Sequence, residues 1–198
     1  VIDTLRSKGV SVIDCSMAST PAMFMTTVML NTDAAVQITA SHHPFNRNGL
    51  KFFTKEGGLG GSDISAVLKA ANENKAVPSA EGSVRKYDFM ADYAAHLRRL
   101  IIDGTGEDKP LSGFKIAVDA GNGAGGFYAY DVLAPLGADI SGSRYLEPDG
   151  MFPNHIPNPE NEQAMQSICE AVLQSGSDLG VIFDTDVDRG GCVDAHGN

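Results

Sequence analysis

The stretch Gly180-Val-Ile-Phe-Asp-Thr-Asp-Val-Asp-Arg189 combines a strand pattern with a cluster of acids. Its apolar run, Val181–Phe183, is typical of a buried strand. Asp184, Asp186 and Asp188 follow on alternate residues, so their carboxylates share one face if the extended backbone continues. Open α/β sheets place their chemistry at the carboxyl ends of strands, and the stretch therefore favours an α/β fold.

These three carboxylates predict a metal site. Neighbouring carboxylates raise one another's pKa, and the single positive charge of Arg189 cannot balance three of them. An all-oxygen set of ligands suits a hard divalent cation, so we expect Asp184, Asp186 and Asp188 to bind Mg²⁺. The alternative is a solvated acidic turn, which rarely follows an apolar strand with strict alternation.

Composition narrows the class of protein. The chain has 198 residues, 42% of them hydrophobic, and 22 glycines, which fits one or two globular domains with many tight turns. A net charge of −10 makes nucleic acid an unfavourable partner. The three cysteines, Cys15, Cys169 and Cys192, are far apart, which indicates reduced thiols in a cytoplasmic protein. No apolar run approaches the ~20 residues of a membrane span, and composition leaves the oligomeric state open.

Strand and helix patterns alternate along the chain. This alternation favours a mostly parallel sheet with helices on its faces. The expected strands are Val10–Asp14, Ala34–Thr39, Leu50–Thr54, Phe114–Asp119, Gly137–Ile140 and the run that leads to Asp184. The expected helices are Ala22–Leu30, Asp63–Asn74, Tyr87–Ile102, Phe127–Leu136 and Glu162–Ser175.

A Gly-, Pro- and charge-containing segment, Asp103–Ser112, reads as a linker and divides the chain into residues 1–105 and 106–198. The segment 77–84 reads as a loop because it is small and polar. Glu147–Asn161 is a long loop with four prolines, and such loops are often functional. The chain starts with the last turns of a helix and stops in a turn, so we expect both ends to be cut from a longer protein.

A second candidate site is the loop around Ser41. Ser41 lies between a strand end and two histidines, His42 and His43, which suggests an activated nucleophile for an acyl or phosphoryl centre. Lys51 begins the next strand and could return to the same pocket as a proton donor or acceptor, but only if its pKa is lowered. Each of these residues alone more often has a structural role. Their combination with the metal-binding pattern favours a catalytic role.

Two other enzyme classes are also compatible with motifs in the sequence. Gly121–Gly126 fits G-x-G-x-x-G, and Asp139 follows at about the ~20-residue spacing of a ribose-binding acid, which would indicate a dinucleotide-dependent oxidoreductase. The same turn could instead face an anion or be a simple tight turn. Asp184-Thr-Asp186 also fits the nucleophile motif of an aspartate-dependent phosphatase of the haloacid-dehalogenase type. Against it, Asp188 is extra and that motif usually stands near the start of such enzymes. A binding module without activity is the plainest alternative.

Four segments resemble the α-D-phosphohexomutases, a family that includes phosphoglucomutase, phosphomannomutase and phosphoglucosamine mutase. Thr39-Ala-Ser-His-His-Pro44 is similar to their phosphoserine loop, and Asn48-Gly-Leu-Lys51 to their Asn-Gly-Phe-Lys. Asp184-Thr-Asp-Val-Asp-Arg189 resembles their metal loop, and Val118-Asp-Ala-Gly-Asn-Gly-Ala-Gly125 the opening of their second domain. Order and spacing agree over nearly the whole chain.

The resemblance implies most of the first two of four domains, each an α/β/α sandwich with a mixed or mostly parallel sheet flanked by helices. Two positions depart from the family pattern, with His43 in place of asparagine and Thr185 in place of glycine. Neither is the implied nucleophile or a metal ligand. The sugar-selecting and phosphate-binding loops of the later domains are absent, so we expect this chain alone to be inactive.

The resemblance further implies an isomerase that interconverts hexose 1-phosphate and hexose 6-phosphate through a phosphoserine and a bisphosphorylated sugar. Ser41 would carry the phosphoryl group, and its phosphate would bind Mg²⁺ together with Asp184, Asp186 and Asp188. Lys51 would act as general acid/base and His42 as polar support. Arg189 would steady the phosphoserine or an aspartate and, with Lys51, bind substrate. The segment 154–160 resembles members that act on mannose and glucose phosphates.

Overall fold

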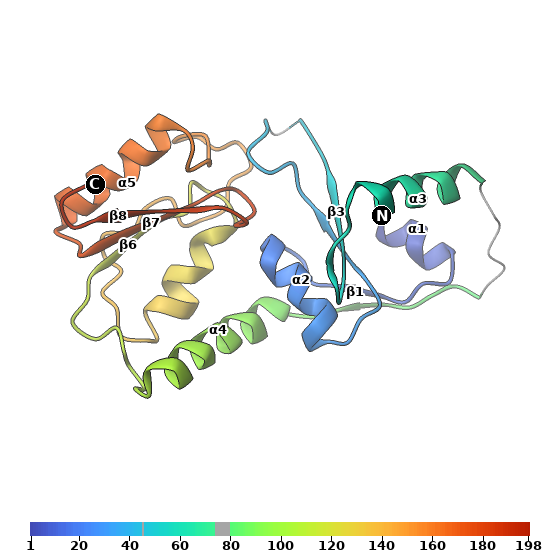
Figure 1. Ribbon diagram of the computed structural model, residues 1–198, viewed down its shortest axis with the longest axis horizontal. Coiled ribbons are helices and arrows are strands. Elements are labelled where there is room, and N and C mark those ends of the chain that lie inside the picture. The colour runs from blue at the N-terminus through green and yellow to red at the C-terminus, as the bar shows by residue number, and fades with distance from the viewer. Residues whose placement is uncertain (45, 74–79) are drawn as a thin grey trace.

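The structure, a computed structural model, describes residues 1–44, 46–73 and 80–198. Figure 1 shows two lobes, with helix α4 (Phe89–Thr105) below the left-hand lobe and pointing toward the right-hand one. The first lobe contains α1 (Ile2–Ser7), β1 (Val12–Asp14), α2 (Thr20–Met29), β2 (Ala35–Ile38), β3 (Leu50–Thr54), β4 (Gly57–Gly58), α3 (Gly61–Glu73) and β5 (Val84–Lys86). Then follow α4 (Phe89–Thr105), β6 (Ile116–Asp119), η1 (Ala124–Gly126), η2 (Tyr128–Leu133), α5 (Glu162–Ser175), β7 (Leu179–Phe183) and β8 (Gly190–Asp194).

The first lobe holds two small sheets around α2. Strand β1 pairs in parallel with β5, whereas β2, β3 and β4 pair antiparallel. Helix α2 begins where Pro21 predicts, because the side chain of Ser19 accepts a hydrogen bond from the backbone N–H of Ala22 at 3.3 Å. Its core is completed by Phe89 and Tyr93 of α4, which is why α4 stays attached to this lobe.

The second lobe has three layers. Its sheet joins β6 and β7 in parallel and β7 and β8 antiparallel. Helix α5 covers one face with a buried apolar stripe, and η2 with part of α4 covers the other (Figure 1). All four residues of β6 are buried, as expected for a strand with helices on both faces. The α/β class predicted from the sequence is confirmed, with mixed sheets.

Several local expectations differ from the structure. Within the predicted helix Phe127–Leu136 the structure has the π-helix η2, a form often found at functional sites, and the 3₁₀ turn η1 lies just before it. The predicted strand Gly137–Ile140 is reduced to a single bridge between Lys115 and Asp139. Sequence analysis also missed β4, β5 and β8, whose small or polar residues show little pattern of their own and are ordered by pairing with neighbours.

The predicted helix end at Asn74 and the start of the predicted loop 77–84 lie outside the described residues. All three cysteines carry free thiols, as composition suggested. Within the described ranges, the search for a helix with the length and apolar character to cross a membrane found none.

Candidate active site

The acidic loop that follows β7 is a turn and not an extended strand. Strand β7 ends at Phe183, and the chain reverses at once into antiparallel β8. Val187 takes φ +68°, and its N–H donates to the carbonyl oxygen of Asp184 at 3.2 Å. The expectation that alternation along a strand aligns the carboxylates is therefore wrong. The reversal does it instead, bringing an oxygen from each of the three aspartates to within 4.8 Å of the others.

The turn is nonetheless buried, unlike a solvated acidic turn. Asp184 and Asp186 are 0% and 3% exposed, while Asp188 lies at the edge of the site. Burial raises the pKa of the Asp184 carboxyl. Burial would also raise the pKa of Asp186, but hydrogen bonds from Lys51 and Thr20 lower it below the ordinary value.

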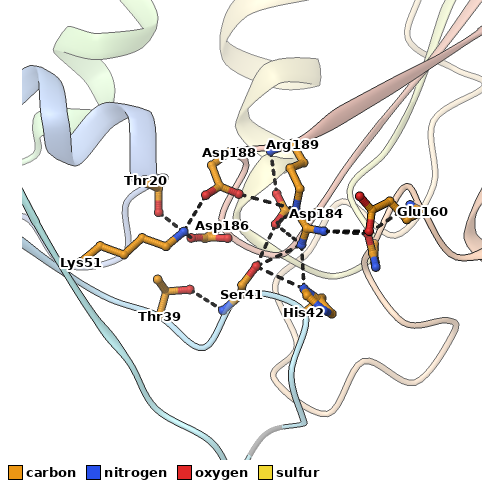
Figure 2. A network of polar contacts seen from close by, with 11 residues as sticks. Thr20, Thr39, Ser41, His42, Lys51, Glu160, Asp184, Asp186, Asp188 and Arg189 are labelled. Carbon is orange, nitrogen blue, oxygen red and sulfur yellow. Dashed lines mark hydrogen bonds and ion pairs between the residues drawn. The ribbon is translucent and has the colours of Figure 1, made fainter. Parts of the chain in front are cut away.

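Lys51 reaches this turn from β3 in the other lobe (Figure 2). Its Nζ donates to Asp186 Oδ2 and to Asp188 Oδ2, each at 2.6 Å. Burial would lower the pKa of Lys51, but these two hydrogen bonds and charges raise it. The lowered pKa that the sequence argument required is absent from this arrangement, so Lys51 holds its proton while it contacts the aspartates.

Ser41 lies in the turn after β2, with φ +53°. Thr39 shapes this turn, because its Oγ1 accepts a hydrogen bond from the backbone N–H of Ser41 at 2.9 Å. The Ser41 hydroxyl then points across to the acidic loop and donates to Asp184 Oδ2 at 3.2 Å. The serine and metal motifs, which come from different lobes, are thus in direct contact.

Arg189 joins these groups from the first residue after the acidic turn (Figure 2). Its Nη2 donates to Asp184 Oδ2 at 2.9 Å and to Ser41 Oγ at 3.1 Å. It also lies 2.7 Å from His42 Nδ1. Because a guanidinium only donates, His42 Nδ1 accepts and its ring proton stands on Nε2. The structure thus brings Ser41, His42, Asp184 and Arg189 together.

The donor set fits a divalent cation. The three carboxylates lie beside two positively charged side chains, Lys51 and Arg189. One negative charge of the cluster is therefore left uncompensated. Asp186 Oδ1 is buried and has no hydrogen-bond partner among the described residues, which is costly for a carboxylate oxygen. Such an oxygen, beside two other carboxylates, is a suitable ligand for a hard cation.

Three supporting residues escaped the sequence analysis. Thr20 Oγ1 donates to Asp186 Oδ2 at 2.6 Å, and its backbone N–H donates to the Asp186 carbonyl at 2.8 Å. Asn158 Oδ1 accepts from Arg189 Nη1 at 3.0 Å, and Glu160 lies 3.7 Å from the same nitrogen. In the sequence, the features that could have pointed to these residues are the hydroxyl-rich turn before α2 and the proline-rich loop.

A small pocket of about 190 Å³ adjoins the acidic turn between the lobes. Gln37 and Thr39 line it from the first lobe, and Asn122, Asp149 and Asp186 from the second. Of the three aspartates, Asp186 lines this pocket, so a small group could reach the acidic turn at Asp186 from this side.

The glycine-rich turn is packed against protein. A Cβ at Gly121, which has φ +52°, would meet Pro157 Cβ at 2.8 Å. A Cβ at Gly123 would meet the carbonyl oxygen of Thr185 at 2.6 Å. Glycine is needed at these positions because other loops of the same chain pack closely against them. This packing explains the glycine-rich motif, so no bound pyrophosphate is needed to explain it. The carboxylate of Asp139, the predicted ribose acid, accepts from the Ser141 N–H at 2.8 Å.

Comparison with known families agrees with this geometry. Residues 1–77 match "Phosphoglucomutase/phosphomannomutase, alpha/beta/alpha domain I", and residues 91–197 match domain II of the same family. The chain belongs to the phosphoglucomutase/phosphomannomutase family. The predicted resemblance is confirmed, and within this family the cluster of three aspartates could hold a metal ion.

Individual relatives support the same membership. The chain is 32% identical to a phosphoglucomutase of Neisseria gonorrhoeae, over 98% of this chain and 41% of that protein. It is 31% identical to a phosphomannomutase/phosphoglucomutase of Pseudomonas syringae pv. tomato, over 100% and 41%. A phosphoglucomutase/phosphomannomutase family protein from Burkholderia thailandensis superposes with a TM-score of 0.84 at 28% identity, covering 99% of this chain and 43% of that one. The chain thus spans about two fifths of the length of these relatives.

Proposed function

We propose that this chain carries the phosphoryl-transfer half of a hexose-phosphate mutase, with Ser41 as the residue that holds the phosphoryl group. The observation that carries this proposal is the contact between Ser41 Oγ and Asp184 Oδ2, 3.2 Å across 143 positions of sequence. This contact places a hydroxyl that could act as a nucleophile beside a carboxylate cluster that could bind a cation. The family relatives named phosphoglucomutase and phosphomannomutase support the same reaction class.

Asp184, Asp186 and Asp188 would hold Mg²⁺, and a phosphate on Ser41 would be a further oxygen ligand. The buried, unpartnered Oδ1 of Asp186 supports this assignment. The ion would neutralise negative charge that develops on phosphorus during transfer.

The protein's own cations complete the electrostatic setting. Arg189 Nη2 lies 3.1 Å from Ser41 Oγ, so its guanidinium would contact a phosphoryl group on that oxygen. His42, which accepts from the same Nη2, keeps the guanidinium turned toward Ser41. Both groups are placed before any reaction begins, which is the arrangement that favours phosphoryl transfer.

In the transfer step, the O–P bond at Ser41 breaks as an O–P bond to a sugar hydroxyl forms. The sugar hydroxyl loses a proton, and the Ser41 oxygen gains one when the free hydroxyl is restored. Lys51 is our candidate for the acid/base at the sugar. Its raised pKa keeps Lys51 protonated in the observed arrangement, so it could exchange a proton with the sugar only after leaving Asp186 and Asp188.

The preferred substrate is a mannose or glucose phosphate, in line with the names of the relatives at 31–32% identity. We further propose a cytoplasmic enzyme, in keeping with its free cysteines. Sugar selection itself would depend on parts of the relatives that this chain does not span.

The covalent state of Ser41 tests the proposal. Because this chain alone is expected to be inactive, a protein of its relatives' full length that contains the chain is incubated with a hexose 1,6-bisphosphate and Mg²⁺, and the phosphorylated residue is mapped by tandem mass spectrometry. We expect phosphoserine at Ser41 and none in Ser41→Ala. Ser16→Ala is the matched control, because Ser16 also follows a strand with positive φ, +57°, yet lies outside the site.

The same experiment separates the alternative enzyme. An aspartate-dependent phosphatase would carry an acyl phosphate on Asp184, which hydroxylamine cleaves and phosphoserine resists. A hydroxylamine-sensitive label that survives in Ser41→Ala and disappears in Asp184→Asn would replace the proposed function with that one.

A further inference from the structure

A second buried polar cluster lies at the end of β6, next to the strand that leads into the acidic turn. At its centre Asp119 is 0% exposed. Its carboxylate accepts from the backbone N–H of Gly121 at 2.9 Å and from the hydroxyl of Ser167 on α5 at 2.6 Å. Both carboxylate oxygens of Asp119 thus act as hydrogen-bond acceptors.

His155 supplies the balancing charge. Its Nε2 lies 3.0 Å from Asp119 Oδ1, and its Nδ1 lies 3.0 Å from the carbonyl oxygen of Ile156. A carbonyl and an ionised carboxylate only accept, so both ring nitrogens must donate. The hydrogen-bond pattern therefore requires an imidazolium, buried and paired with Asp119.

The surroundings favour this charge state. Besides Asp119 on β6, the charged groups that face the cluster are Arg144, from the segment before the proline-rich loop, and Glu170, from α5. Burial and Arg144 lower the pKa of His155, but the hydrogen bonds to Asp119 and Ile156 and the charge of Asp119 outweigh them and raise it. Tyr145 meets the imidazole edge-on, with ring centroids 5.6 Å apart, and Ser167 is the polar neighbour on α5.

This ion pair holds the proline-rich loop, residues 147–161, onto the sheet. Pro157 then packs on Gly121, where even a Cβ would be only 2.8 Å from it. The next residue, Asn158, bonds its N–H to the Ile156 carbonyl at 2.8 Å and accepts from Arg189 Nη1 at 3.0 Å. A short, rigid path thus runs from the buried histidine to the arginine beside Ser41.

We propose that His155 is a positioning residue for phosphoryl transfer: clamped to Asp119, it holds Asn158 against Arg189 and so sets the guanidinium beside Ser41. The inference deepens the proposed function and rests on it for the role of Arg189. It assigns a task to the proline-rich loop and to Gly121, two sequence features that the phosphoryl chemistry does not use directly.

Nuclear magnetic resonance of this chain, labelled with ¹⁵N at histidine and arginine, tests the clamp directly. As pH is raised from about 6 to 8, the range in which an exposed histidine titrates, we expect the His155 ring to keep both protons to a higher pH than an exposed histidine does. A neutral His155 ring at the acid end of this range would overturn the proposal. This measurement needs no variant and does not depend on whether a variant folds.

Arg189 provides the second readout. In His155→Gln we expect its Nε–H resonance to shift and broaden, and in Asn158→Ala to shift in the same direction. The double variant should add little to either, because both act on one path. His196→Gln, at an exposed histidine near the end of the chain, is the matched control and should leave the resonance in place. An unchanged Arg189 resonance in folded Asn158→Ala or His155→Gln would refute the proposal.

Kinetics separate this inference from the proposed function. In a protein of its relatives' full length that contains this chain, phosphorylation of Ser41 by a hexose 1,6-bisphosphate should slow about tenfold in both variants, since a misplaced guanidinium weakens transition-state stabilisation. If the Arg189 resonance responds but Ser41 is never phosphorylated in that protein without a substitution, the clamp stands and the mutase proposal fails. If Ser41 is phosphorylated at the same rate in both variants, the mutase proposal stands and the positioning role fails.

Discussion

Lys51 and Asp186 are 135 positions apart in sequence, yet Lys51 Nζ donates to Asp186 Oδ2 at 2.6 Å. The same ammonium donates to Asp188, so it takes two of the three carboxylates expected to bind a cation. A divalent cation held by these aspartates would therefore compete with Lys51 for the negative charge of the same carboxylates. This competition would link metal binding to the availability of the candidate acid/base.

Lys51→Met should strengthen binding of Mn²⁺ or Mg²⁺ about tenfold, because it removes the competitor and raises the negative charge of the site. In metal-chelating buffer the same change should lower the free energy of unfolding by about 1–3 kcal/mol, because Asp186 loses its partner. Isothermal titration calorimetry and urea unfolding measure the two effects. Lys55→Met, at an exposed lysine four residues on, should change neither, and weaker metal binding in Lys51→Met would contradict the competition.

Arg189→Lys should lower the free energy of unfolding by about 2–4 kcal/mol. A lysine keeps the positive charge but cannot reproduce the hydrogen bonds that the guanidinium makes with Asp184, Ser41 and Asn158. Arg99→Lys is the control, since among the described residues Arg99 pairs with Asp103 at an exposed position. Equal losses in the two variants, measured by urea unfolding, would mean that Arg189 is an ordinary surface arginine.

Stability should depend on pH through His155. Its pKa is raised in the folded chain, so its contribution is fully present below the unfolded value of about 6.5 and is lost as pH rises through the folded value. The difference in unfolding free energy between the unaltered chain and His155→Gln should therefore shrink as pH rises above about 6.5. Urea unfolding across a pH series provides the measurement. A difference that stays constant or grows with pH would show that His155 is buried as a neutral ring.

Gly123→Ala should disturb the acidic turn, because the new Cβ would lie 2.6 Å from the carbonyl oxygen of Thr185, between two of the aspartates. We expect a loss of about 1–3 kcal/mol in unfolding free energy and weaker Mn²⁺ binding. Gly150→Ala is the control, as its Cβ meets nothing within 4 Å. Unaltered stability and metal binding in Gly123→Ala would show that this close approach is not required.

Local patterns were sufficient for much of the fold. The apolar run before Asp184 is strand β7, and the predicted helix Glu162–Ser175 matches α5 at both ends, where Asn161 caps its start and Gly176 its end. The sequence patterns did not predict elements whose conformation depends on pairing with another strand. Strand β5 has three exposed residues and forms only because β1 pairs with it. The turn after β7 likewise depends on β8, which reverses the chain where alternation suggested extension.

The sequence by itself determined which residue types stand ready at strand ends: a serine and a histidine after β2, a lysine in β3 and three aspartates after β7. Their order and spacing also determined the family. Only the tertiary structure decided which of them meet, that Ser41 contacts Asp184, that Lys51 contacts Asp186, and that the proline-rich loop reaches Arg189. Spacing and periodicity describe local backbone geometry, whereas contacts across a hundred positions depend on how whole sheets and loops pack.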